Sequence, residues 1–379
     1  MTIIGVIGAG AMGSGIAQIA STCGFEVRLY DVNSDMCKKA LAIISISLNR
    51  FIDKGKLMPE DHAGILGRIY ICESLESMRD CNLIIEAVAE DIHIKKELFI
   101  RLENIVSADC ILATNTSSLS VTSIASSVIV PGRCIGIHFF NPVVLMQLVE
   151  IIPAVQTEDS TTSAALQLIN SWGKSVVIAK DTPGFIVNKI ARPFYGEAIR
   201  ILEEGLADIN EIDLAMTTQG FRMGPFALMD FIGHDINYKV TESIWKSFFY
   251  DSKYRPSFTQ LRLLEAGYLG KKSDKGFYTY PTEIKENSII AEKTSNIFLR
   301  IIAMLINEAA DTVYLNICNE KDVELAVILG LNFPKGLLEW GKELGYEKII
   351  AALDHLFKTY HEERYRVSPF LYTLASQTK

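Results

Sequence analysis

The first half of the chain alternates between short apolar runs and longer stretches in which apolar residues recur every three or four positions. Four of the short runs predict buried strands, at 3–7, 27–30, 83–85 and 111–113. The stretch 34–54 predicts a helix, because Ile44 and Leu48 fall on one face. Asn33 or Ser34 can cap the start of this helix. Strands that alternate with helices predict a parallel α/β sheet.

The pattern changes near residue 183, where strand-like runs disappear. Helical periodicity then continues to the end of the chain, except for a polar stretch that predicts a linker. Three pairs of similar fragments share an offset of 111 residues: 197–198 with 308–309, 213–215 with 324–326, and 254–257 with 365–368. A constant offset predicts a duplicated helical domain. We therefore expect an α/β domain at 1–182, a helical domain at 183–280, a linker at 281–294 and a second helical copy at 295–379.

A glycine-rich segment, Gly8-Ala9-Gly10-Ala11-Met12-Gly13, joins the first predicted strand to a helix. Gly8 suits a tight turn, Gly10 lets a pyrophosphate approach backbone N–H groups, and Gly13 allows close packing of the helix on the strand. Asp31 ends the second strand, where a carboxylate binds an adenosine ribose and repels a 2′-phosphate. This order predicts a Rossmann-type domain that binds NAD in preference to NADP. The alternative is a glycine turn without a ligand.

A histidine and a glutamate lie in two neighbouring apolar segments. His138 occurs within Ile-Gly-Ile-His-Phe-Phe-Asn-Pro, and Glu150 follows twelve residues later within Leu-Val-Glu-Ile-Ile. Because an unpaired charge is costly to bury, we expect the two side chains to pair, with Glu150 accepting from one imidazole nitrogen. The other nitrogen can then exchange a proton with a substrate. The residues alone leave a catalytic dyad and a structural ion pair as alternatives.

Polar residues follow the strand predicted at 111–113, in the segment Thr-Asn-Thr-Ser-Ser that contains Ser117. Ligands bind at the carboxyl ends of strands in open α/β sheets, although the same residue types also form ordinary turns. Further along, Asp181 or Thr182 is expected to cap a helix that has Pro183 in its first turn. Asn188 lies within that predicted helix, and it contributes to a site only if its face lines a cleft.

Two basic residues, Arg50 and Lys54, lie one helical turn apart on the polar face of the predicted 34–54 helix. A solvated helix face is the ordinary interpretation of such a pair. The alternative is a clamp for the phosphates of a substrate.

The composition narrows the class of protein. Hydrophobic residues make up 49% of the 379 residues and the net charge is −8, which excludes a mostly disordered chain and argues against general nucleic-acid binding. Seven scattered cysteines without a Cys-x-x-Cys pair predict reduced packing residues and no metal site. The most apolar stretch, 135–155, contains several polar residues, so no membrane segment is expected. The first strand begins without a preceding leader, which predicts a cytoplasmic protein.

Together, these segments resemble the L-3-hydroxyacyl-CoA dehydrogenase family, including 3-hydroxybutyryl-CoA dehydrogenases, from about residue 3 to about residue 280. The motifs that carry the resemblance are GAGAMGSGIAQ, EAVAED, NTSSL, HFFNPV, KDTPGFIVN, MGPFALMD and GKKSDKGFY. The segments LEWG and EERYRVSP, at 338–341 and 362–369, resemble the second helical copy of longer members, such as those of phenylacetate degradation.

The resemblance implies a role for each matching residue. His138 and Glu150 match the catalytic dyad, and Ser117 and Asn188 match residues that contact the substrate oxygen. Contacts to NAD are implied for Gly8, Gly10, Ala11, Met12, Gly13, Asp31, Glu90, Lys95, Ser117, Asn141 and Lys272. Arg50 and Lys54 match basic residues that approach the CoA phosphates, although the first of them is commonly Lys.

The implied reaction is the reversible, NAD-dependent oxidation of (S)-3-hydroxyacyl-CoA to 3-oxoacyl-CoA, with a short-chain substrate such as 3-hydroxybutyryl-CoA. The alternatives are 3-hydroxyadipyl-CoA as substrate, a hydroxyacid dehydrogenase of the same plan that does not use CoA, and a non-catalytic NAD-binding protein. Short members of the family pair through the helical domain. A second copy therefore implies either a monomer with an internal pseudo-dimer or a homodimer.

Overall fold

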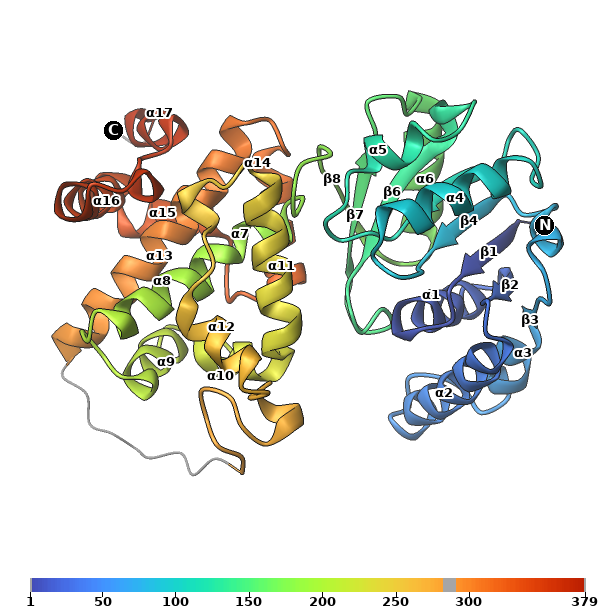
Figure 1. Cartoon of the computed structure of the whole chain (residues 1–379), viewed down its shortest axis with the longest axis horizontal. Helices are drawn as coiled ribbons and strands as arrows, with labels where there is room; N and C mark the ends of the chain where they lie inside the picture. Colours follow the sequence, from blue (N-terminus) through green and yellow to red (C-terminus); the bar gives the residue numbers. More distant parts are fainter. Residues whose placement is uncertain (1, 282–290, 378–379) are drawn as a thin grey trace. The chain divides into compact units, whose positions relative to one another are not determined.

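The computed structural model describes residues 2–281 and 291–377. The chain forms two compact units, Met1–Thr182 and Pro183–Lys379 (Figure 1). The first unit contains a β-sheet covered by helices, and the second unit is helical. The structure therefore confirms an α/β domain followed by a helical region.

The first unit is built on an eight-stranded sheet in the order β3-β2-β1-β4-β5-β6-β7-β8. The strands are β1 (Ile3–Ile7), β2 (Glu26–Tyr30), β3 (Ile69–Ile71), β4 (Leu83–Glu86), β5 (Ile111–Thr114), β6 (Cys134–Phe139), β7 (Leu148–Pro153) and β8 (Ser175–Ile178). Neighbouring strands run parallel except for β6 and β7. In such a sheet the strand order reverses between β1 and β4, and dinucleotides bind outside the carboxyl ends of the strands at that point.

The β6–β7 pair is the one antiparallel pair among the described strands of this predominantly parallel sheet. A parallel pair needs a crossover of about a dozen residues or more, usually with a helix, and the connection 140–147 is shorter than that. The chain therefore turns back, and the register places His138 directly opposite Glu150. The reversal of direction brings the two predicted polar side chains together on the sheet.

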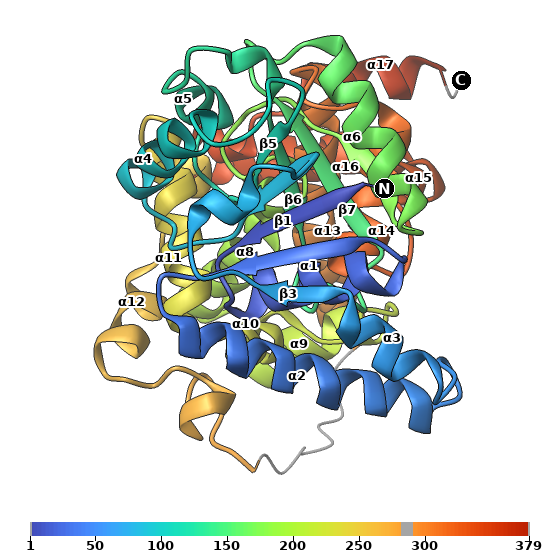
Figure 2. The same cartoon turned by 90° about the vertical axis from the view of Figure 1, so that its right-hand side faces the viewer.

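Helices cover both faces of this sheet. They are α1 (Ala11–Thr22), α2 (Ser34–Asp53), α3 (Asp61–Gly67), α4 (Ile92–Glu103), α5 (Val121–Ala125) and α6 (Asp159–Ser171), with single 3₁₀ turns at η1 (Leu75–Met78) and η2 (Pro131–Arg133). Apolar side chains of α1, α2 and α6 share one buried cluster with the sheet, and α4 and α5 lie on the other side from α6 (Figure 2). The α2 helix confirms the predicted 34–54 helix, and the Asn33 side chain caps it by accepting from the N–H of Asp35.

The second unit repeats one series of helices. Its elements are α7 (Val187–Ile190), α8 (Arg192–Glu203), α9 (Ile209–Thr217), α10 (Pro225–Ile232), α11 (His234–Ser247), η3 (Ser252–Tyr254), α12 (Phe258–Glu265), η4 (Lys271–Ser273), α13 (Ala291–Tyr314), α14 (Glu320–Leu331), α15 (Leu337–Leu344), α16 (Tyr346–Tyr360), η5 (Glu363–Tyr365) and α17 (Pro369–Gln377). The series α8-α9-α10-α11-η3-α12 recurs in the same order as α13-α14-α15-α16-η5-α17. The predicted duplication of the helical domain is therefore present in the fold.

The two copies also use the same joint between helices. Asp213 in α9 accepts hydrogen bonds from backbone N–H groups at the start of α10, and Glu324 in α14 does so at the start of α15. A glycine precedes the second helix of each joint, and a Cβ at Gly224 or Gly336 would overlap the acidic side chain. Both copies thus keep a glycine where an acidic side chain approaches the backbone.

Two predicted details need correction. The predicted helix capped by Asp181 or Thr182 is wrong, because Gly184 and Phe185 have φ of 76° and 49° and α7 begins only at Val187. The Asp181 carboxylate instead accepts from backbone N–H groups at the start of α5. The α13 helix begins at Ala291, inside the predicted linker, and residues 282–290 lie outside the described residues.

The seven cysteines are free thiols, and five of them are buried. The part of the chain that the structure describes has no group of three or more His, Cys, Asp or Glu side chains that could hold a metal ion. No described helix is long and apolar enough to cross a membrane.

Candidate active site

The glycine turn after β1 has the geometry that a pyrophosphate requires. Gly8 has φ of 99°, and a Cβ there would lie 2.5 Å from the carbonyl oxygen of Ala87 at the end of β4. A Cβ at Gly13 would lie 1.7 Å from the carbonyl oxygen of Gly8, so only glycine lets α1 approach the turn this closely. Around Gly10, in contrast, nothing lies within 4 Å of a Cβ position. Open space remains where the backbone N–H groups at the start of α1, at Ala11 and Met12, can meet an anion.

The Asp31 carboxylate is hydrogen-bonded to this glycine turn. One of its oxygens accepts from the N–H of Ala9 at 2.8 Å, and the other accepts from the N–H of Asn33 at 2.9 Å. The carboxylate therefore lies beside the first turn of the glycine segment, at the end of β2. An acidic group in this position suits a ribose diol and opposes a 2′-phosphate.

His138 and Glu150 form a buried pair near the carboxyl end of β6. The His138 Nδ1 atom lies 2.7 Å from Glu150 Oε2, and the two side chains are 6% and 0% exposed. The Phe140 ring packs on the imidazole with a centroid separation of 4.5 Å. Since Nδ1 faces the carboxylate, the pair fixes the orientation of the ring, and Nε2 is the nitrogen on its other side. The predicted pairing is therefore present.

The loop after β5 is fastened beside this pair. The Asn115 side-chain oxygen accepts from the N–H of Phe139 at 2.8 Å, which ties the loop to the residue after His138. Ser117 follows two residues later in the same loop and is partly exposed. The polar segment predicted at the strand end thus lies next to the His–Glu pair.

A buried ionic cluster stabilises the other end of the same loop. Lys95 Nζ lies 2.6 Å from Glu86 Oε1 and 3.2 Å from Glu90 Oε2. Glu90 in turn accepts from the Thr116 hydroxyl at 2.5 Å and from the N–H of Ser117 at 3.0 Å. Burial alone would raise the pKa of the Glu90 carboxyl, but Lys95 and these hydrogen bonds outweigh burial and lower the pKa. Glu90 is therefore anionic, and the hydrogen bond that it accepts from the Ser117 N–H fixes the position of the Ser117 backbone.

Glu86 is a residue that the sequence reasoning missed. It is fully buried, and besides Lys95 it accepts from the Thr114 hydroxyl at 2.7 Å. The available signal was an acidic residue at the end of an apolar run, nine positions before a lysine. Lys95, which was expected to contact NAD, is 1% exposed, so its direct action in the structure is to join Glu86 and Glu90.

The connection between β6 and β7 carries Asn141, which is exposed. Lys174 holds this connection, since its ammonium donates to the carbonyl oxygens of Val143 at 2.6 Å and Met146 at 2.7 Å. Burial lowers the pKa of Lys174 to about 8. A Cβ at Gly15 would lie 2.8 Å from Val143, so the connection packs against α1. Asn141 therefore lies in a segment that runs from the His–Glu pair to the glycine helix.

The remaining predicted residues lie elsewhere. Arg50 and Lys54 are exposed at the end of α2, which is compatible with both interpretations of the basic pair. In the second unit, Asn188 is the second residue of α7 and is partly exposed. Lys272 is exposed in η4, with its ammonium 2.5 Å from the Asp235 carboxylate.

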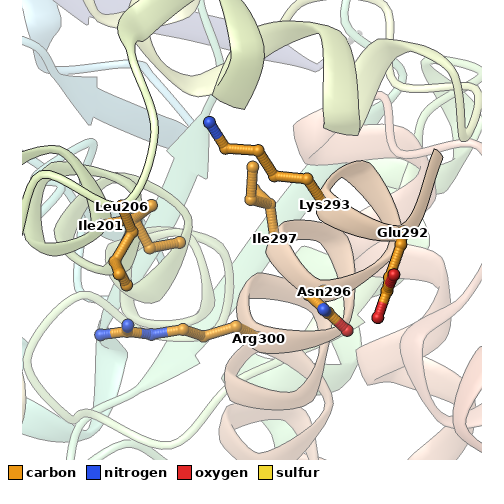
Figure 3. Close-up of a pocket in the computed structure, with 7 residues that line it drawn as sticks. All are labelled: Ile201, Leu206, Glu292, Lys293, Asn296, Ile297 and Arg300. Carbon is orange, nitrogen blue, oxygen red and sulfur yellow. The ribbon is translucent and has the colours of Figure 1, made fainter. Parts of the chain in front are cut away.

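A cavity of about 410 Å³ lies in the second unit, between α13 and the segment that includes Ile201 and Leu206. Figure 3 shows Ile297 and Arg300 extending from α13 toward the side on which those two residues lie. None of the predicted site residues lines this cavity. Its cations already have carboxylate partners, Lys293 with Glu211 and Arg300 with Glu197 and Glu204. It is therefore separate from the candidate active site.

The strand order, the open space at Gly10 and the Asp31 carboxylate define the class of NAD-dependent dehydrogenases with a Rossmann-type domain. Residues 3–182 match the family model described as 3-hydroxyacyl-CoA dehydrogenase, NAD binding domain. Residues 184–280 and 297–379 match the model described as 3-hydroxyacyl-CoA dehydrogenase, C-terminal domain. The chain belongs to the 3-hydroxyacyl-CoA dehydrogenase family. It is an oxidoreductase that uses NAD to oxidise 3-hydroxyacyl-CoA.

Relatives of two lengths are similar to this chain. The 3-hydroxyadipyl-CoA dehydrogenase of Escherichia coli is 32% identical over 96% of this chain and 95% of its own length. The 3-hydroxybutyryl-CoA dehydrogenase of Bradyrhizobium diazoefficiens is 41% identical over 73% of this chain and 94% of its own length. The crystal structure of 3-hydroxybutyryl-CoA dehydrogenase from Escherichia coli has a TM-score of 0.95 and 31% identity, and covers 100% of this chain and 98% of that chain.

Proposed function

We propose that His138 and Glu150 are the acid–base centre of this dehydrogenase. The observation that carries the proposal is the buried contact of 2.7 Å between His138 Nδ1 and Glu150 Oε2. This pair lies near the carboxyl end of β6, and the glycine turn follows the carboxyl end of β1 at the same edge of the sheet. A histidine whose one nitrogen is held by a carboxylate is suited to take or give a proton at the other nitrogen.

In the oxidation direction, His138 Nε2 takes the proton of the 3-hydroxyl group. NAD, when bound, supplies the acceptor for the hydride that leaves C3. Glu150 stabilises the imidazolium that forms, because its negative charge lies against Nδ1. In the reduction direction, the imidazolium donates its proton to the 3-keto oxygen, and Ser117 and Asn188 support the negative charge that develops on that oxygen.

The glycine turn and Asp31 are proposed to hold NAD. Gly8, Gly10 and Gly13 shape the turn, the backbone at Ala11 and Met12 receives the pyrophosphate, and Asp31 binds the ribose. Further contacts are proposed for Glu90, Lys95, Ser117, Asn141 and Lys272. Since Lys95 is buried among carboxylates, we expect it to act by placing Glu90 and Ser117.

We propose a short-chain acyl-CoA such as 3-hydroxybutyryl-CoA as substrate, with Arg50 and Lys54 near the CoA phosphates. The names of the relatives that are about 40% identical support this choice. A second candidate is 3-hydroxyadipyl-CoA, which the relative that covers 96% of this chain is named for. We also propose a cytoplasmic location, which the seven free cysteines support, and a monomer in which the second helical copy takes the place of a partner subunit.

The deciding experiment measures kcat/KM with NADH for 3-oxoacyl-CoAs from C4 to C16 and for 3-oxoadipyl-CoA. The same assay is then run on His138→Gln, which should lower kcat by about 10²–10⁴-fold with NADH binding nearly unchanged, the usual effect of losing a general base or acid. Activity of this variant within threefold of the wild type would remove His138 from its proposed role. A preference for 3-oxoadipyl-CoA over the C4 substrate would favour the second candidate.

A further inference from the structure

The second unit contains a buried ionic cluster that joins its two helical copies. Glu308, in α13 of the second copy, is fully buried. Its carboxylate lies 2.5 Å from Lys189 Nζ and 2.6 Å from Lys253 Nζ, and it accepts from the Tyr254 hydroxyl at 2.6 Å. Burial alone would raise the pKa of Glu308, but the two lysines outweigh burial and hold the pKa well below its usual range. All three partners of this carboxylate belong to the first copy.

A matching cluster lies at the position related by the duplication. Glu197 of the first copy corresponds to Glu308, at the offset of 111 residues. Glu197 is also buried, and it accepts from Arg300 Nε at 2.6 Å and from the Tyr365 hydroxyl at 2.9 Å. Arg300 and Tyr365 are the counterparts of Lys189 and Tyr254 in the second copy. Each copy therefore supplies one glutamate and receives a tyrosine from the other copy, together with two lysines at Glu308 and one arginine at Glu197.

The two clusters differ in the residue that precedes the cation. Asn188 precedes Lys189 in the first copy, whereas Leu299 precedes Arg300 in the second. Leucine has no hydrogen-bonding group, so only the Glu308 cluster lies beside a side chain that can contact a substrate oxygen. The chain therefore contains one ionic cluster beside the side-chain amide of Asn188 and one ionic cluster beside the apolar side chain of Leu299.

The segment that carries Asn188 depends on such support. The α7 helix spans only Val187–Ile190, has no side-chain cap and is joined to α8 through the single residue Ala191, and a helix of four residues contributes little stability of its own. It follows Gly184 and Phe185, both with positive φ, and this conformation is unfavourable for a residue with a side chain such as Phe185. The fully buried Lys189 side chain fastens α7 to α13 through Glu308 and the Thr312 hydroxyl, which lies 3.0 Å from Nζ.

We propose that Glu308 of the second copy is a positioning residue for the dehydrogenase reaction, which holds Asn188 in place through Lys189. This inference rests on the proposed role of Asn188. Loss of the Glu308–Lys189 contact allows α7 to shift, and a displacement of about 1 Å at a group that positions substrate lowers turnover by up to about 10²-fold. The effect falls on kcat, because the developing charge on the oxygen needs the amide most in the transition state.

The test compares Glu308→Gln with Glu197→Gln in the full chain, with acetoacetyl-CoA and NADH as substrates. Both changes remove one carboxylate from a buried cluster between the copies, so both are expected to lower the melting temperature. Glu308→Gln should lower kcat by about 10-fold to 10²-fold with little change in the KM for NADH, whereas Glu197→Gln should keep kcat within threefold of the wild type. Equal losses of kcat in the two variants would overturn the proposal, since both clusters would then act only on stability.

A double-mutant cycle separates this inference from the role of Asn188. If Glu308 acts through Asn188, Glu308→Gln slows the wild type but has little further effect in an Asn188→Ala chain. An undiminished effect in that background contradicts the inference. A normal kcat for Asn188→Ala contradicts the proposed role of Asn188 itself, whereas a slow Asn188→Ala beside a normal Glu308→Gln contradicts only the action of Glu308.

Glu308→Gln leaves two lysines facing one buried carboxylate, Asp311, and this can prevent folding. The paired change Lys189→Met with Glu308→Gln removes one charge of each sign. Its matched control is Arg300→Met with Glu197→Gln. The same outcomes apply: a kcat loss confined to the first pair supports the inference, and equal losses overturn it.

Discussion

Replacement of Glu150 by Gln tests the electrostatic part of the proposed mechanism. The change keeps the size of a side chain that is fully buried and leaves an oxygen that can still accept from His138 Nδ1. It removes only the negative charge beside the imidazolium. The rate of 3-oxoacyl-CoA reduction at pH 7 should therefore fall, and the amount by which it falls measures what that charge contributes.

The magnitude follows from the geometry of the pair. With Nδ1 and Oε2 at 2.7 Å, the two charge centres are about 4 Å apart, and opposite charges at that distance attract by about 4 kcal/mol at an effective dielectric constant near 20. Since each 1.4 kcal/mol or so is a factor of ten in rate, the full loss is about 10³-fold. The neutral hydrogen bond that glutamine keeps reduces this, so we expect a loss of about 10²–10³-fold in kcat.

The electrostatic role of Glu150 also predicts the direction in which the pH dependence of the rate should change. Reduction needs the imidazolium, which is less stable without the carboxylate, so the alkaline fall in rate should move to lower pH in Glu150→Gln. The measurement is kcat against pH with acetoacetyl-CoA and NADH. His234→Gln is the matched control, because His234 forms a second buried pair with Asp230 at 2.8 Å in the helical unit. An unshifted profile with kcat within threefold of the wild type would refute the electrostatic role of Glu150.

Four further predictions follow from the structure. Because the Asp31 carboxylate is held beside the glycine turn, where we propose that it binds the ribose and opposes a 2′-phosphate, kcat/KM should favour NADH over NADPH, and equal values would contradict this. Arg50→Ala combined with Lys54→Ala should raise the KM for acyl-CoA and make this KM less sensitive to salt. An unchanged KM at low ionic strength would indicate that both residues belong to an ordinary solvated helix face. Deletion of 290–379 removes the helices α13 to α17, which bury many apolar side chains, so aggregation or new dimerisation should be seen by light scattering, and a monomeric, fully active product would exclude a covering role. Burial raises the pKa of Asp213 to about 6 from an ordinary value near 4, so the native state binds this proton more tightly than the unfolded chain. The stability that it contributes, up to about 3 kcal/mol, is complete below about pH 4 and is lost as the pH rises through 6; Asp213→Asn should flatten this part of the urea-midpoint profile, and an unchanged profile would argue against it.

The features that the sequence predicted well either depend on one short segment of the chain or involve charged groups that are costly to bury unpaired. Gly8 and Gly13 are required by turn geometry and close packing within one short segment, so their spacing was sufficient to predict the turn. His138 and Glu150 were predicted to pair because each would be expensive to bury alone. The constant offset between fragments predicted the duplication without any knowledge of the helices themselves.

The features that were missed depend on partners distant in sequence. Lys174 follows an ordinary turn and looks like a solvated lysine, yet it is buried against two carbonyl oxygens that the β6–β7 connection brings to it. Asp181 has the right neighbours to cap the helix after it, but the fold places the start of α5 within reach of its carboxylate. The exchange of tyrosines between Glu197 and Glu308 likewise appears only when the two copies are packed together.

The fusion of two helical copies in one chain also changes how the enzyme responds to dilution. When such a contact forms between separate subunits, the fraction of associated subunits falls as the protein is diluted. A side chain that the contact holds in place then loses its support. Here Lys189 and Glu308 belong to one polypeptide, so their association is intramolecular and its strength is set by the chain that joins them. Dilution from micromolar to nanomolar enzyme should therefore leave this contact, and the position of α7 that it fixes, unchanged.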